Sequence, residues 1–129
     1  MRIYVAHSKK MDYINKIYRP LRKDEELNKH TLLLPHENSS KSNNDREFYK
    51  TIDIFIAEVT FAGTGLGIEL GWVYDDNIPI YCLYKSGSKI SSSVKSITNN
   101  IFEYSNEEEF VKLVKSIVEK YDLDNRNYR

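Results

Sequence analysis

The side chain best suited to chemistry is Glu69, which follows a glycine-rich segment opening at Gly63. That segment comes directly after an apolar run, residues 53–59, which has the length of a strand. Glycines let a backbone approach a ligand closely, and the unpaired N–H groups of a helix start favour an ionised carboxylate. A nucleophilic carboxylate needs such a setting. We therefore predict that Glu69 is a nucleophile, in the first turn of a helix.

The glycines fit neither of two common phosphate-binding loops. A dinucleotide-binding fingerprint places its glycines after the first strand, whereas the loop expected there, residues 7–10, contains none. No Gly-Lys-Ser/Thr follows either, which excludes a Walker loop. The alternative to a ligand site is a tight strand-to-helix turn, with Gly71 permitting close packing. The glycines alone leave both interpretations open.

Several other polar residues follow expected strands. Ser8, Lys9 and Lys10 come after the first strand and are candidates to bind a phosphate, as are the serines at 91–93. Glu58 fits a buried hydrogen-bonding acid better than a catalytic one, because buried charges need partners. The spacing of the His and Cys residues does not resemble a metal site.

Five strand candidates alternate with helical or polar stretches, at 2–6, 31–34, 53–59, 78–84 and 100–104. A helical pattern begins after Asp12, and Pro20 is expected to kink that helix or to start a second one. An amphipathic helix closes the chain after a polar cap at 105–108. This alternation predicts an α/β fold: one doubly wound, flavodoxin- or Rossmann-like domain, with a five-stranded parallel sheet and helices on both faces. Ligands bind beyond the carboxyl ends of such strands.

Length and composition bound the remaining possibilities. The 129 residues suffice for one domain, which we expect over residues 1–121, with a C-terminal tail over 122–129. Nineteen basic and nineteen acidic side chains cancel, which disfavours a nucleic acid polymer or a membrane as partner. The single Cys82, with no signal peptide and no long apolar stretch, favours a cytoplasmic protein.

Several segments together resemble the nucleoside 2-deoxyribosyltransferase superfamily, and most closely its 2'-deoxynucleoside 5'-phosphate N-hydrolase branch. The similarity covers nearly the whole chain in order and is densest from residue 45 to residue 94. Its segments are Tyr4, Asp45 eight residues before Asp53, Ala57-Glu58-Val59-Thr60, Gly65-Leu66-Gly67-Ile68-Glu69-Leu70-Gly71, Cys82-Leu83-Tyr84, and Ser86-Gly87-Ser88-Lys89-Ile90-Ser91-Ser92-Ser93-Val94.

The resemblance implies a role for each matching residue. Glu69 would attack C1' of the sugar, Tyr4 would orient its carboxylate, and Asp45 would act in proton transfer. Ser92 matches a phosphate-binding serine supplied by a neighbouring subunit, which implies a homodimer with shared active sites. No metal or organic cofactor is implied. The remaining candidates for substrate binding are Ser8, Lys9, Lys10, Gly63, Thr64, Gly65 and Gly67.

The chain departs from the branch at two places. Residues 7–10 replace a loop that contains glycine and arginine, and lysine supplies charge without the bidentate fork of arginine. Gly63 stands where the hydrolases have a serine and the transferases tend to have an acid. Both departures concern the 5'-phosphate more than the glycosidic bond.

The expected activity is cleavage of the N-glycosidic bond of a (deoxy)nucleoside or its 5'-monophosphate, through a covalent glycosyl–Glu69 intermediate, with water as acceptor. Oxocarbenium character at C1' is stabilised by an adjacent carboxylate, and the departing base needs a proton. Two alternatives remain. One is a 2-deoxyribosyltransferase that moves deoxyribose between bases, and the other is a non-catalytic nucleotide-binding or sensor domain.

Overall fold

The computed structural model describes residues 1–38 and 45–127, and its centre is a five-stranded, fully parallel sheet of order β2-β1-β3-β4-β5. The strands are β1 (Arg2–His7), β2 (Thr31–Leu33), β3 (Ile54–Glu58), β4 (Ile80–Lys85) and β5 (Ile101–Tyr104). The strand order turns back at β1, so the crevice beside β1 and β3 is where a doubly wound sheet binds ligands. All five predicted strands are present, each within two residues of the expected bounds.

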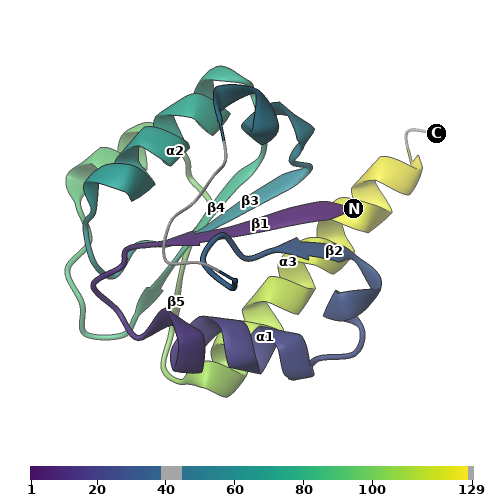
Figure 1. The fold of residues 1–129 in the computed structure, drawn as a ribbon, viewed down its shortest axis with the longest axis horizontal. Helices are drawn as coiled ribbons and strands as arrows, with labels where there is room; N and C mark the ends of the chain where they lie inside the picture. The colour runs from purple at the N-terminus through teal and green to yellow at the C-terminus, as the bar shows by residue number, and fades with distance from the viewer. Residues whose placement is uncertain (39–44, 128–129) are drawn as a thin grey trace.

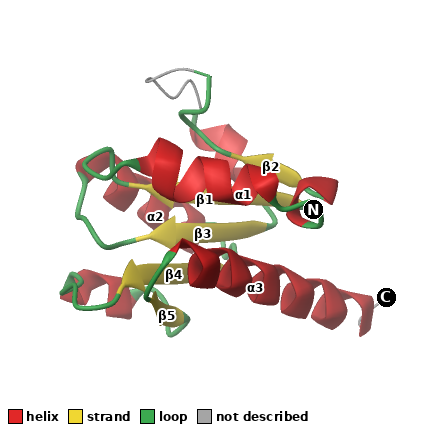
Figure 2. Ribbon diagram, turned by 90° about the horizontal axis from the view of Figure 1, so that it is seen from below, coloured by secondary structure: helices red, strands yellow, loops and turns green. Residues whose placement is uncertain are grey.

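Helices cover both faces of the sheet, as predicted (Figure 1). One face carries α1 (Arg19–Lys23) and α3 (Glu107–Asn127), and the other carries α2 (Thr64–Asp75). Figure 2 shows α3 running along the sheet with its C-terminal end projecting beyond it. Four short helical turns complete the chain: η1 (Ile14–Tyr18), η2 (Leu27–Lys29), η3 (Arg46–Thr51) and η4 (Ser92–Ser96).

Alternation along β1 divides its side chains between two cores. Ile3 and Val5 pack with α1 and α3, whereas Tyr4 and Ala6 pack with α2. Successive side chains of a strand point to opposite faces, so the same alternation turns His7 toward the α1 side. Tyr4 therefore lies beneath α2, and the residue types of one strand already decide which face the site occupies.

Two helices differ from the sequence prediction. Pro20 does start a second helix: the π-helical turn η1 ends at Tyr18, and α1 begins at Arg19 with the proline in its first turn, where a missing N–H costs nothing. The closing helix does not stop at Tyr121. It continues to Asn127, through the segment expected to be a frayed tail, because no glycine or proline interrupts it. Residues 38–44 are all Asn, Ser or Lys, a composition that predicts a polar loop; after residue 38 this stretch lies outside the described residues.

No helix in the described ranges, 1–38 and 45–127, is long and apolar enough to cross a membrane.

Candidate active site

Two tyrosine hydroxyls donate hydrogen bonds to the carboxylate of Glu69. The Tyr4 hydroxyl donates to Oε2 of Glu69, and the Tyr49 hydroxyl donates to the same oxygen at 2.9 Å. The two hydroxyl oxygens are 3.4 Å apart, and both rings are buried. Oε1 forms no hydrogen bond with any described residue. One oxygen is thus fixed and the other is left for a ligand.

Burial and two hydrogen bonds act in opposite directions on the pKa of this carboxylate. Desolvation raises the pKa of Glu69 above its usual value, and the bonds from Tyr4 and Tyr49 oppose that rise. Burial and the adjacent Glu69 charge raise the pKa of Tyr4 far above its ordinary value, so Tyr4 remains a donor. The two hydroxyls are therefore what holds the ionised form of Glu69 in a half-buried place.

The prediction that a helix start holds Glu69 is wrong. Helix α2 begins at Thr64 after the extended Gly63, so Glu69 falls in its second turn. The glycines at 65, 67 and 71 belong to the helix rather than to a preceding loop. A Cβ at any of these three would meet nothing within 4 Å, so packing within the described chain does not require glycine there. Gly71 is not a close-packing glycine in this chain.

Tyr49 is a site residue that sequence reasoning missed. It lies on η3, and its ring packs edge-on against Trp72 of α2 at 5.3 Å and tilted against Tyr4 at 5.4 Å. Ten tyrosines in the chain gave no means of choosing this one. The available signal was its place four residues after Asp45, on the segment that leads into β3.

A cavity of about 450 Å³ opens above Glu69. It is bounded by the loop after β1, by the start of α2 and by one residue after β2. The lining residues are His7, Ser8, Lys9, Lys10, His36, Gly63, Thr64, Gly65, Leu66 and Glu69. The structure therefore brings together most of the predicted site: Glu69, the three polar residues after β1, and Gly63, Thr64 and Gly65.

The start of α2 gives this cavity a set of backbone donors. The first N–H bonded within the helix is that of Gly67, to the Gly63 carbonyl at 3.0 Å. The N–H groups before it therefore have no partner inside the helix, and Thr64, Gly65 and Leu66 line the cavity. Such a helix start, beside Lys9 and Lys10, suits an anionic group.

Ser8 and Gly63 both line the cavity and lie against each other. A Cβ at position 63 would lie 3.2 Å from the Ser8 hydroxyl oxygen, so any side chain larger than that of glycine would crowd the contact between the loops after β3 and β1. The Ser8 hydroxyl accepts the Lys10 N–H at 3.1 Å and donates to the Ala62 carbonyl at 3.4 Å. The Ser8 hydroxyl oxygen therefore lies next to the place where a side chain at position 63 would begin.

His7 is held as a neutral imidazole in the cavity wall. The Ser8 carbonyl can only accept, so Nδ1 of His7 carries the proton and donates to it at 3.0 Å. Nε2 of the neutral ring then accepts from the Tyr18 hydroxyl at 2.6 Å, and the same hydroxyl oxygen accepts the His36 N–H at 3.0 Å. Burial is the main cause that lowers the pKa of His7 to about 4; the bond to the Ser8 carbonyl opposes this, and the nearby His36 and Lys9 contribute to the lowering. Tyr13 stacks on the ring at 4.4 Å between centroids.

Apart from Tyr4, which contacts Glu69 from the buried core, three predicted site residues do not line this cavity. Asp45 is exposed, and its carboxylate caps η3 by accepting the Phe48 N–H at 3.0 Å. Ser92 begins η4, does not line the cavity over Glu69 and is also exposed. Gly67 lines the neighbouring groove rather than the cavity over Glu69. A single chain therefore does not assemble every residue that the resemblance implies.

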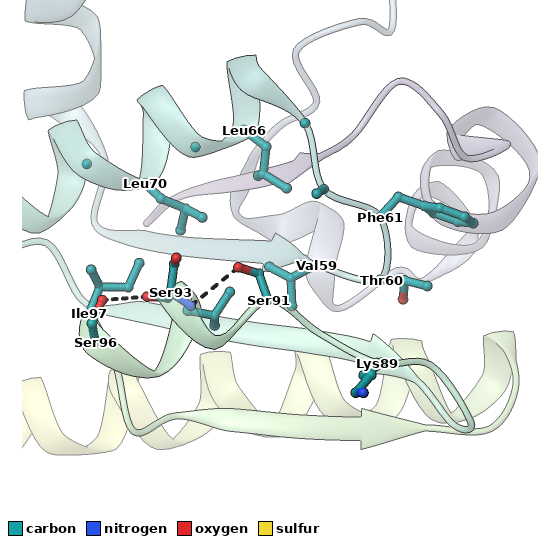
Figure 3. A pocket seen from close by; sticks show the side chains of 15 residues that line it. Val59, Thr60, Phe61, Leu66, Leu70, Lys89, Ser91, Ser93, Ser96 and Ile97 are labelled. Carbon is teal, nitrogen blue, oxygen red and sulfur yellow. Dashed lines mark hydrogen bonds between the residues drawn. The ribbon is translucent and has the colours of Figure 1, made fainter.

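A second, largely apolar groove of about 320 Å³ separates α2 from η4. Figure 3 shows Leu66 and Leu70 of α2 pointing toward Ser93 and Ile97, with Val59 beside them. Gly63 and Leu66 line both this groove and the cavity over Glu69, so the two hollows adjoin at the start of α2.

Within the described residues, no group of three or more His, Cys, Asp or Glu side chains could hold a metal ion.

Comparison with known proteins identifies the fold. No protein-family model matches the chain, and no curated protein matches its sequence. Among solved structures, the chain is similar to the CMP N-glycosidase BcmB of Clostridium botulinum, with a TM-score of 0.60 and 20% identity, over 89% of this chain and 99% of that one. It is equally similar to a conserved protein from Enterococcus faecalis V583, with a TM-score of 0.60 and 19% identity, over 90% and 98%. The fold implied by the resemblance is confirmed, and the chain shares it with an N-glycosidase.

Proposed function

We propose that the protein is an N-glycosidase of the nucleoside 2-deoxyribosyltransferase superfamily, which hydrolyses a (deoxy)nucleoside 5'-monophosphate through a glycosyl–Glu69 intermediate. One observation carries the proposal: a half-buried carboxylate has one oxygen fixed by two tyrosine hydroxyls and lines a cavity of nucleotide size. The fold shared with a CMP N-glycosidase supports the same class of reaction.

In the first step, Oε1 of Glu69 bonds to C1' while the bond from C1' to the base nitrogen breaks. The electron pair leaves with the base, which takes a proton from a general acid. Asp45 is the acid that the resemblance implies. The oxygen nearest C1' stabilises the developing oxocarbenium charge, and the tyrosines hold the carboxylate so that little reorganisation is needed.

In the second step, water attacks C1', and the ester bond to Glu69 breaks. The water proton passes to the acid–base group, and Glu69 leaves as a carboxylate. Two displacements at C1' retain its configuration. Water is the proposed acceptor because the serine loop resembles the hydrolase branch; a second base in place of water would make the enzyme a transferase.

A 5'-phosphate is proposed from the donors at one end of the cavity. The free N–H groups at the start of α2, together with Lys9 and Lys10, favour an anion there, and Ser8 and Thr64 add hydroxyls. Ser92 of a second subunit is proposed to complete this end. Two features support this homodimer: Ser92 does not line its own chain's cavity, and the adjoining groove beside α2 is apolar and open.

The test is base release from a panel of nucleosides and their 5'-monophosphates, followed by chromatography. Glu69→Gln should lower kcat by at least about a thousandfold, because the loss of a nucleophile removes several kcal/mol of transition-state stabilisation. Glu119→Gln, an exposed change on α3, is the matched control and should retain activity.

The alternatives predict different products. A transferase gives a new nucleoside when a second free base is added, whereas a hydrolase gives the free sugar or sugar phosphate. A sensor binds nucleotide without turnover in either the parent protein or Glu69→Gln. Full activity in Glu69→Gln would refute the nucleophile assignment.

A further inference from the structure

A separate cavity of about 360 Å³ lies beyond the carboxyl ends of β3, β4 and β5, on the face covered by α3. It shares only Lys10 with the cavity over Glu69. Ser8, in the loop after β1, contacts Ala62 and Gly63, in the loop after β3. Its volume falls within the range of small-molecule sites.

The floor of this second cavity is a buried carboxylate without a cation. Glu58 is 1% exposed, and no described Lys, Arg or His forms an ion pair with it. Oε1 accepts the Thr60 N–H at 2.6 Å, and Oε2 accepts the Thr60 hydroxyl at 2.8 Å and the Tyr104 hydroxyl. Oε1 thus keeps room for another donor.

The rim of the same cavity carries two lysines without an acidic partner, together with the Asp12 carboxylate, whose oxygens accept from Asn15. Neither the Lys10 nor the Lys85 ammonium forms an ion pair with any described residue, whereas Lys16 is paired with Glu107 at 3.4 Å. The backbone N–H of Lys85 donates to the Thr60 hydroxyl at 2.9 Å, so the rim lysine and the carboxylate floor are joined through one threonine.

The lysines at the rim and the carboxylate at the floor favour different groups on a ligand. Unpaired ammonium groups attract a phosphate, which lysine binds as a point charge. A phosphate ion alone would meet the negative floor unfavourably, so the part of the ligand that lies inside must donate hydrogen bonds. Sugar hydroxyls do this toward a carboxylate, and they also accept from Ser88 and Lys85. Phe61, 43% exposed, offers an apolar edge.

We propose that this second cavity binds a sugar phosphate, with the phosphate on Lys10 and Lys85 and a sugar hydroxyl donating to Glu58. The site does not depend on turnover at Glu69. Lys10 lines both cavities, so a ligand in the second cavity also contacts the loop after β1, which lines the first.

The test is a titration of isotope-labelled protein with ribose 5-phosphate, followed by amide chemical shifts. We expect saturable shifts at Thr60, Lys85 and Ser88, equally in the parent protein and in Glu69→Gln. Lys85→Met keeps the aliphatic stem and removes the charge, so it should weaken this binding at least about tenfold, as expected when a hydrogen bond to a charged group is lost. Lys120→Met, on the exposed side of α3, has the same net charge and should bind as the parent does.

Three results would overturn the proposal. They are shifts confined to residues 63–65 of the other cavity, equal affinity in Lys85→Met and Lys120→Met, and equal affinity for ribose without phosphate. None of these bears on base release by Glu69, which the activity panel measures separately.

Discussion

Two phenol hydroxyls, from Tyr4 and Tyr49, converge on a single oxygen of Glu69. The two carboxylate oxygens therefore differ in role, because Oε2 is fixed from below and Oε1 is free to reach a ligand. Tyr49 comes from a different element than Tyr4, and its ring is braced by Trp72 of the same helix that carries Glu69. The position of the carboxylate thus depends on a strand, a short helical turn and a helix together.

Tyr49→Phe should lower kcat/KM roughly tenfold, because it removes one hydrogen bond, worth about 1.5 kcal/mol, to a charged group. It also removes one of the two bonds that keep the pKa of Glu69 down. Since the ionised carboxylate is the nucleophile, activity falls as pH drops through this pKa. The acidic limb of the pH profile should therefore move to higher pH.

Tyr81→Phe is the control for a lost tyrosine hydroxyl, because Tyr81 packs on the opposite face of the sheet. It should leave the acidic limb in place. If Tyr49→Phe loses stability but keeps the parent pH profile, then Tyr49 contributes packing and its hydroxyl does not tune the pKa of Glu69.

His7 should make the folded state sensitive to acid. Its folded pKa is about 4 against an ordinary value of 6.5, so the folded form resists protonation. Its contribution to the free energy of unfolding is complete above pH 6.5 and is lost as pH falls from 6.5 to 4. A shift of this size corresponds to about 3 kcal/mol.

Denaturant unfolding at pH 7 and at pH 4.5 measures this loss. His7→Gln should be less stable than the parent at pH 7 and should lose less stability on acidification. His30→Gln, which removes a histidine beside the N-terminus, should keep the parent's pH dependence apart from its own small part. An equal loss of unfolding free energy between pH 7 and pH 4.5 in His7→Gln and the parent would contradict a neutral His7 imidazole.

At the scale of elements, the loops after β1 and β3 lie against each other at Gly63, where a Cβ would be crowded. A methyl group at this position would lie 3.2 Å from the Ser8 hydroxyl oxygen. The backbone there is extended, so alanine meets crowding and not backbone strain.

The crowding can be measured by a double-mutant cycle of Gly63→Ala and Ser8→Ala. We expect Gly63→Ala to be less favourable in the parent than in Ser8→Ala, with a coupling of about 0.5–1 kcal/mol, as for side chains in direct contact. Additive free energies of unfolding would mean that the two loops do not touch in solution.

The sequence was sufficient for the elements and their order. Runs of strand length with helical patterns between them gave the parallel sheet, and the period of two in β1 fixed which side chains face α2. The closing helix was underestimated because polar residues after Tyr121 weaken the apolar stripe without stopping a helix. The predicted contact of Tyr4 with Glu69 is present in the structure. The predicted hold of a helix start on this carboxylate is not, since the start of α2 precedes Glu69 by more than a turn.

Residues brought together by the fold were harder to foresee. Tyr49, and the pairing of Glu58 with Tyr104 from another strand, depend on contacts between segments distant in sequence. Glu58 was predicted to be a buried hydrogen-bonding acid, and the structure confirms this; its cavity was not foreseen. The roles of Asp45 and Ser92 stay predictions, because both rest on the resemblance.

At the scale of the whole molecule, the proposal requires two chains for each complete site. Glu69→Gln and Ser92→Ala should each be impaired when alone. After subunit exchange, half of an equal mixture is heterodimer, in which one of two sites has both residues intact. About a quarter of the parent activity should therefore return, as expected for a symmetric dimer with shared sites.

Sedimentation would accompany this mixing experiment. A fully active monomer, or exchanged heterodimers that recover nothing, would remove the shared-site proposal while leaving the chemistry at Glu69 untouched.

The most direct test of the account is the mass of the protein during turnover. The parent enzyme is mixed with the preferred nucleotide and quenched in acid within one turnover, and its intact mass and peptide masses are recorded. We predict an adduct equal to the sugar phosphate, located at Glu69 and absent from Glu69→Gln. Base released at the full rate while the protein stays unmodified, or an adduct on another residue, would contradict the account.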